Sequence, residues 1–210
     1  SGLVFPIAED DITCDPIDIP THWPRLCGID FGWDHPTAAV WITWDRDSDI
    51  TYVYDCYSMR QEAVPIHASA IKARGKWIPV IWPMDGRQAD KGSGKSLTEQ
   101  YRIEGLNMTR EHFTNPPSQG EKDGSGGVSV EAGIMEMYTR MQTRRLKIFT
   151  NQSKLLEELR MYHRKDGKIV PMYDDIISAM RYCIMSLRKS RIKDYQPPHI
   201  QADSEFSLFA

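Results

Sequence analysis

The sequence predicts an α/β fold in which a mixed β-sheet is flanked by helices on both faces. Three β-rich segments follow one another early in the chain and are joined by short links, which predicts an antiparallel meander. Beyond residue 64 the apolar residues adopt a helical period, and helical segments then alternate with short apolar strands. A meander followed by such alternation gives a sheet with both antiparallel and parallel strands.

The meander is expected over residues 26–32, 38–44 and 50–58, with a polar turn between the second and third strands. A helix is expected to begin at Val64, because Pro65 suits a first helical turn, and to end before Gly75. The remaining strands are expected at residues 77–82, 107–113, 146–149 and 169–172, and the remaining helices at residues 97–106, from a cap at Ser129 to about 141, at 155–162 and at 175–189.

The chain length predicts one domain, which we expect to occupy residues 25–193. Residues 1–24 contain four prolines and a cluster of acids, which is typical of a linker or surface arm. Residues 194–210 show little periodicity and are expected to form a flexible tail. The chain begins at Ser1 without methionine, so we expect it to be part of a longer polypeptide.

Composition narrows the classes of function. The four cysteines are far apart and form no C-x-x-C pair, so a zinc site is not expected. No charged-then-apolar leader is present and no apolar run approaches ~18 residues, so we expect neither secretion nor membrane spanning.

Charge is distributed unevenly along the chain. The net charge is −3, yet residues 140–193 carry 14 Lys and Arg against 5 Asp and Glu. A basic segment beside acidic ones is typical of a protein that binds a phosphate backbone and holds metal through carboxylates. Solvated helix faces rich in Lys and Arg are the alternative interpretation.

Aspartates interrupt or end apolar segments at three places. Asp30 lies inside LCGIDFG and Asp85 ends VIWPMDG, where a carboxylate is costly unless a cation lies opposite. Asp174 and Asp175 begin the last long helix, where an aspartate is either an N-cap or a ligand. Such acids can converge on hard divalent ions such as Mg²⁺ or Mn²⁺. Two ions ~3.5–4 Å apart would support phosphodiester hydrolysis.

The segments GIDFGWDHPTAAVWITW, VIWPMDG and DDIISAMRY resemble the C-terminal nuclease domain of the large terminase subunit of tailed bacteriophages, over about residues 25–190. The resemblance implies a ribonuclease H-like fold and an Mg²⁺- or Mn²⁺-dependent endonuclease that cuts concatemeric double-stranded DNA with little sequence specificity during genome packaging. It places two ligands at Asp30 and Asp85. Relatives often show Asp-His-x-x-Asp-Ala-x-Arg-Tyr at the last helix, where this chain has Asp174, Asp175 and Ser178, so the third ligand is Asp174 or Asp175.

The resemblance also implies partners and a location. These are double-stranded DNA, an N-terminal ATPase domain of the same polypeptide, a portal ring and a small terminase subunit, in the cytoplasm of the host cell. A non-catalytic module that docks on the portal or on DNA is an alternative function.

A second alternative is a P-loop ATPase, because ADKGSGKS at residues 89–96 fits a loose P-loop pattern. A Walker A loop connects a buried strand directly to a helix. Here residues 83–88 separate the strand from the motif, so we interpret the match as accidental. Lys91 and Lys95 remain candidates for phosphate contact, with a solvated loop as the alternative.

Further basic residues are candidates for DNA contact. They are Lys122 in a Gly/Ser-rich segment and Arg140 and Arg144 in the basic region, with solvated surface as the alternative for each. His35 follows Asp30 closely and could approach the metal ions or simply serve as a polar turn residue. Binding through phosphates predicts that DNA affinity falls steeply with salt.

Overall fold

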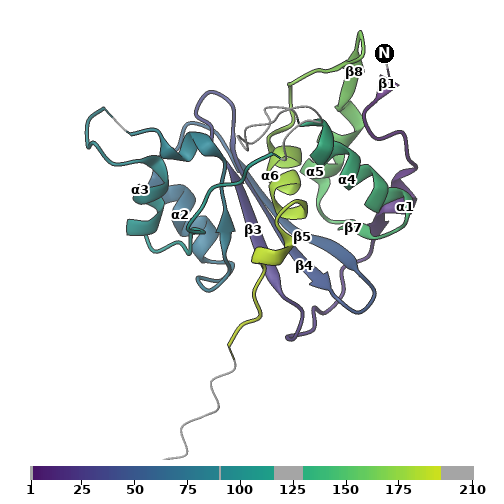
Figure 1. Ribbon diagram of the computed structural model, residues 1–210, viewed down its shortest axis with the longest axis horizontal. Helices are drawn as coiled ribbons and strands as arrows, with labels where there is room; N and C mark the ends of the chain where they lie inside the picture. The colour runs from purple at the N-terminus through teal and green to yellow at the C-terminus, as the bar shows by residue number, and fades with distance from the viewer. Residues whose placement is uncertain (1, 90, 116–129, 195–210) are drawn as a thin grey trace, which may run out of the picture.

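The core of the chain is a six-stranded mixed sheet of order β2-β7-β5-β4-β3-β6 (Figure 1). The computed structural model describes residues 2–89, 91–115 and 130–194. In that part of the chain, a smaller three-stranded sheet has the order β1-β8-β9. The strands are β1 (Gly2–Leu3), β2 (Thr13–Cys14), β3 (Arg25–Asp30), β4 (Thr37–Asp45), β5 (Ile50–Met59), β6 (Val80–Ile81), β7 (Leu146–Phe149), β8 (His163–Lys165) and β9 (Lys168–Ile169).

The predicted antiparallel meander is confirmed by β3, β4 and β5. Its register places Asp30 opposite Ala38, and Ala38 opposite Ser58. Strand β6 pairs parallel to β3, and β7 pairs parallel to β5. Strands β3, β5, β6 and β7 therefore run in one direction, and we call the edge of the sheet where they end the carboxyl edge.

Helices cover both faces of the sheet, as predicted (Figure 1). In β4, Val40 and Ile42 pack into the core beneath α4, α5 and α6, whereas Trp41 packs into the core beneath α2 and α3. This alternation is the period of two that a strand buried on both faces requires. The helices are α1 (Glu9–Ile12), α2 (Val64–Lys72), α3 (Leu97–Ile103), α4 (Glu131–Gln142), α5 (Ser153–Met161) and α6 (Asp175–Ile184), with 3₁₀ turns η1 (Met84–Arg87) and η2 (Leu187–Lys189).

Gly28 allows α6 to lie close against the meander. A Cβ at this position would lie 2.4 Å from the Ala179 carbonyl oxygen and 2.8 Å from the Cys183 Sγ. Any side chain would therefore push α6 away from β3. The close approach brings Tyr182 of α6 within hydrogen-bonding distance of Asp30.

The expected surface arm is wrong for residues 2–14, which are part of the packed structure. Phe5 and Ile12 are buried in the main core. Strand β2 extends the six-stranded sheet by pairing parallel to β7, with Thr13 opposite Ile148. The domain boundaries near residues 24 and 193 stay predictions, and residues 195–210 lie outside the described residues.

Two predicted strands are much shorter than expected. Within residues 77–82 only Val80 and Ile81 are paired, because Pro79 lacks a backbone N–H and Ile78 turns back to bond the Gly75 carbonyl. Within residues 107–113 the structure has only an isolated bridge at Met108. A bend follows that bridge, so the segment runs beside β6 without becoming a strand.

The other elements are confirmed with adjusted ends. The last helix stops at Ile184, and η2 continues toward Lys189. The strand expected at 169–172 shortens to β9 because Pro171 interrupts it. The predicted cap Ser129 lies outside the described residues. Over the residues described, no helix has the length and apolar character needed to cross a membrane.

Candidate active site

Three of the predicted acids line one cleft at the carboxyl edge of the sheet. Asp30 is the last residue of β3, and Asp174 and Asp175 lie at the start of α6. The cleft has a volume of about 920 Å³, and these three carboxylates contribute to its lining. Asp85 lies in η1, after β6, at the same edge, and its charge acts on Asp30. The structure therefore brings the predicted acids to one region.

Asp30 is an acid strongly perturbed by its surroundings. Burial raises its pKa to about 7, and the charges of Asp85 and Asp175 act in the same direction. The Tyr182 hydroxyl donates a hydrogen bond to Asp30 Oδ1 at 2.8 Å, which opposes this rise because it stabilises the carboxylate. Desolvation also raises the pKa of Asp85.

The two acids at the start of α6 differ in their contacts. Asp174 occupies the N-cap position, but its side chain accepts no capping hydrogen bond. Burial raises the pKa of Asp174, and the neighbouring charge of Asp175 adds to the rise. The Oδ1 atom of Asp175 lies 2.7 Å from Nδ1 of His35, which reaches across from the β3–β4 connection. The N-cap interpretation therefore does not account for the Asp174 side chain.

Glu158 of α5, which is not among the predicted site residues, performs the capping that Asp174 does not. Its carboxylate accepts hydrogen bonds from the backbone N–H groups of Ile176 and Ile177, at 3.0 Å each to Oε2. Glu158 also lines the cleft. Burial raises its pKa to about 8, and the nearby charges of Asp175 and Asp174 contribute.

The chemistry of this cleft fits a hard divalent cation. Its carboxylates are oxygen donors, and burial and mutual repulsion raise the pKa values of Asp30, Glu158 and Asp174. Within the described part of the chain, none of these three acids forms an ion pair with Lys or Arg. A cation would relieve this repulsion. In the same described residues, no three His, Cys, Asp or Glu side chains stand close enough to form a preassembled metal site.

The P-loop-like segment does not have the structure of a Walker A loop. Turn η1 intervenes between β6 and the motif, and Ala89 pairs with Ser96 in an isolated antiparallel bridge. Ser96 then caps α3 by accepting a hydrogen bond from the Glu99 backbone N–H. Lys91 and Lys95 are exposed, so contact of either with phosphate stays a prediction.

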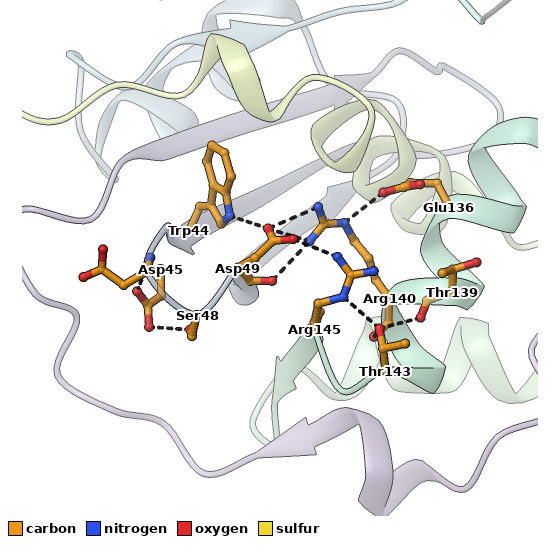
Figure 2. Close-up of polar contacts among 10 residues, drawn as sticks. Trp44, Asp45, Ser48, Asp49, Glu136, Thr139, Arg140, Thr143 and Arg145 are labelled. Carbon is orange, nitrogen blue, oxygen red and sulfur yellow. Dashed lines mark hydrogen bonds and ion pairs between the residues drawn. The ribbon is translucent and has the colours of Figure 1, made fainter.

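Arg140, a predicted DNA-contact residue, is held by acids within the fold (Figure 2), so contact with DNA stays a prediction. Its side chain is only 8% exposed and lies 3.3 Å from Asp49 Oδ1 and 3.1 Å from Glu136 Oε1. Arg145 and the Trp44 indole also bond Asp49, at 2.7 and 2.9 Å. These contacts fasten the β4–β5 turn to α4, at the edge opposite the acids.

Arg144 also lies away from the cleft. It is exposed, precedes β7 at the edge opposite the acids, and forms an ion pair of 3.3 Å with Asp11. A DNA contact by Arg144 would therefore be separate from the candidate active site. Lys122 lies outside the described residues.

A mixed sheet with an antiparallel meander, helices on both faces and acids at its carboxyl edge defines a ribonuclease H-like domain. The sequence model described as "Terminase RNaseH-like domain" matches residues 27–187. The chain belongs to this family, which confirms both the resemblance and the predicted fold.

Comparison with individual relatives agrees with this assignment. The chain is 38% identical over 200 residues to the large terminase subunit of Salmonella phage P22. The aligned region covers 94% of this chain and 38% of that protein. The solved nuclease domain of the P22 large terminase superposes with a TM-score of 0.80 at 38% identity, covering 91% of this chain and 95% of that domain. The large terminase nuclease of phage G20c, solved with bound magnesium, shares the fold with a TM-score of 0.57 at 20% identity, covering 88% of this chain and 97% of that one.

Proposed function

We propose that the chain is a divalent-metal-dependent endonuclease that cleaves double-stranded DNA with little sequence specificity during viral genome packaging. The observation that carries the proposal is the convergence of Asp30, Asp174 and Asp175 in one cleft. Support also comes from the 38% identity to the P22 nuclease domain, which spans nearly the whole chain.

In this proposal Asp30, Asp85 and Asp174 hold two Mg²⁺ or Mn²⁺ ions, with Asp175 as the alternative third ligand. Asp174 is preferred because its side chain is not used as a helix cap, whereas Asp175 is already bonded to His35. Bound ions of this kind activate water and stabilise the leaving oxygen of a phosphodiester. The nuclease of phage G20c has been solved with magnesium, cobalt or zinc bound, which supports a divalent metal at this site.

The protein's own residues prepare the site for that chemistry. The Tyr182 hydroxyl fixes one oxygen of Asp30 and favours its ionised form. Glu158 holds the first turn of α6 through two backbone N–H groups, which orients Asp174 and Asp175 toward the cleft. Such supporting contacts set the orientation of ligands and thereby the affinity for metal.

The partners belong to the same proposal. The chain spans about 38% of the length of the curated relatives that it matches. We propose that an N-terminal ATPase domain belongs to the same polypeptide, that the portal ring and the small terminase subunit are binding partners, and that the protein acts in the host cytoplasm.

The proposal is tested by metal binding and by cleavage of supercoiled plasmid, with Mg²⁺, Mn²⁺, Ca²⁺ or EDTA. The variants are Asp30→Asn, Asp85→Asn, Asp174→Asn and Asp175→Asn, with Asp47→Asn as a control because Asp47 is exposed in the β4–β5 turn. Cleavage is measured both for this chain and for a longer polypeptide that includes the preceding domain. We expect Mg²⁺- or Mn²⁺-dependent cleavage that is lost in the Asp30 and Asp85 variants, and the Asp174 and Asp175 variants decide the third ligand.

Other outcomes would favour other functions. Equal cleavage by all five variants would place the activity outside this cleft and refute the proposal. ATP binding that is lost on Lys95→Ala would support the P-loop ATPase. Binding to the portal ring, with no metal binding and no cleavage in either polypeptide, would support the docking module.

A further inference from the structure

Two basic residues share the carboxyl edge of the sheet with the acids. Arg60 directly follows the end of β5, and Lys154 is the second residue of α5, which follows β7. Both line the same cleft as Asp30. Asp30 ends β3 and Asp85 follows β6, and we call this side the acidic end, whereas Arg60 and Lys154 follow β5 and β7 at what we call the basic end. Glu157 and Glu158 of α5 lie within one turn of Lys154 and also line the cleft. Ligands of open α/β sheets bind outside the carboxyl ends of the strands.

The register of the meander sets the distance between the acidic and basic ends. Asp30, Ala38 and Ser58 lie opposite one another on β3, β4 and β5. Neighbouring strands are about 4.8 Å apart, so the backbone at Ser58 lies roughly 10 Å from that at Asp30. Arg60 lies two residues beyond Ser58, just past the end of β5. With about 3.4 Å of helix axis per nucleotide, this distance corresponds to about two to three nucleotides of one DNA strand.

The charges of Arg60 and Lys154 are available for a ligand. Both residues are exposed, and neither forms an ion pair within the described part of the chain. Lys154 Nζ has a long contact of 3.4 Å with the Ser58 carbonyl oxygen, which keeps it beside the end of β5. By contrast, Arg160 at the other end of α5 is bonded to both carboxylate oxygens of Glu9.

We propose that Arg60 and Lys154 bind the phosphates of the DNA strand that is to be cut, two to three nucleotides from the scissile phosphate. This inference rests on the proposed nuclease function and adds the path of the substrate strand across the carboxyl edge. A polyanion is repelled by a cleft lined with carboxylates unless cations receive it. Metal ions would neutralise the acidic end, and Arg60 and Lys154 attract the backbone at the other end.

The wall of the cleft is consistent with this path. Met172 and Tyr173 line it and are 57% and 60% exposed. Apolar side chains of this kind contact sugars and bases, while Arg and Lys contact the phosphates. Glu157 also lines the cleft, and its charge acts on Arg160 of the same helix.

The test measures duplex binding by fluorescence anisotropy in Ca²⁺, from 50 to 200 mM salt, for the parent chain, Arg60→Ala, Lys154→Ala and the double variant. Lys76→Ala is the matched control, because Lys76 is exposed in the α2–β6 connection, at the opposite edge of the sheet. Each phosphate contact contributes about 0.9 to the slope of log affinity against log salt. Over this fourfold range, removing one contact reduces the loss of affinity by about 3.5-fold.

We expect both single variants to lower the slope by about 0.9 and the double variant by about 1.8, with the metal affinity unchanged. Slopes equal to those of the parent and Lys76→Ala would overturn the proposal, and so would the absence of any duplex binding by the parent chain. Failure of the nuclease proposal is seen separately, as cleavage that is absent or unaffected by Asp30→Asn.

Discussion

Replacing Asp30 with asparagine should stabilise the metal-free protein at neutral and alkaline pH. In the fold, burial raises the pKa of this carboxyl to about 7, whereas an aspartate in an unfolded chain has a pKa of about 3.9. A difference of about three units disfavours the ionised folded form by about 4 kcal/mol. Asparagine is neutral at every pH and still offers an oxygen to the Tyr182 hydroxyl.

The sign of the pH dependence follows from the pH at which Asp30 loses its proton in the folded and in the unfolded protein. Below pH ~4, Asp30 is protonated in both states and contributes no difference. Between pH ~4 and the folded pKa of about 7, only the unfolded state releases the proton, so the parent protein loses stability as the pH rises. Above that pKa the loss is complete. The advantage of Asp30→Asn should therefore grow by about 2–3 kcal/mol between pH 5 and pH 8.

The assay is urea denaturation in EDTA at pH 5, 6.5 and 8, comparing the parent, Asp30→Asn and the exposed-site control Asp47→Asn. In a parallel series, saturating Mg²⁺ should raise the stability of the parent and leave Asp30→Asn unchanged. An Asp30→Asn advantage of the same size at pH 5 and pH 8 would refute the argument that burial perturbs this carboxyl.

Two further substitutions distinguish a residue that tunes the Asp30 carboxylate from a residue that only stabilises the fold. Tyr182→Phe removes the donor that stabilises the Asp30 carboxylate, so the pKa of Asp30 should rise further, by about one to two units. The acidic limb of the pH profile of cleavage should shift upward, and an unchanged profile would contradict this role. Arg140→Ala removes the partner of Asp49 and Glu136 and should lower the free energy of unfolding by about 1–2 kcal/mol, because both acids are partly exposed. DNA affinity should not change, and weaker DNA binding at unaltered stability would show that Arg140 contacts DNA after all.

Local patterns were sufficient to predict the meander and the position of Asp30. The alternation of Trp41 with Val40 and Ile42 is a property of a few adjacent residues, and it fixes both the strand and its two buried faces. The carboxylate at Asp30 stands out because it interrupts such a strand. The apolar pattern of the meander therefore predicts both the strands and the aspartate that departs from that pattern.

Other features depend on partners that are distant in the sequence. Glu158 lies in an amphipathic helix, where an acid resembles any solvated surface residue, and its role appears only when the start of α6 packs beside it. Arg140 is buried by Asp49, which is 91 residues away. Residues 2–14 were misjudged because strands of two residues have no period of their own and exist only through their pairing with β7 and β8.

Because Glu158 caps α6, the position of α5 affects both the basic residue Lys154 and the aspartates at the start of α6. Lys154 lies at the start of this helix and Glu158 one turn later, so any displacement of α5 moves both side chains together. Through its two hydrogen bonds, Glu158 would carry the first turn of α6, and with it Asp174 and Asp175. Binding of a phosphate at Lys154 that displaces α5 would therefore also change the distances between Asp30 and the two aspartates of α6.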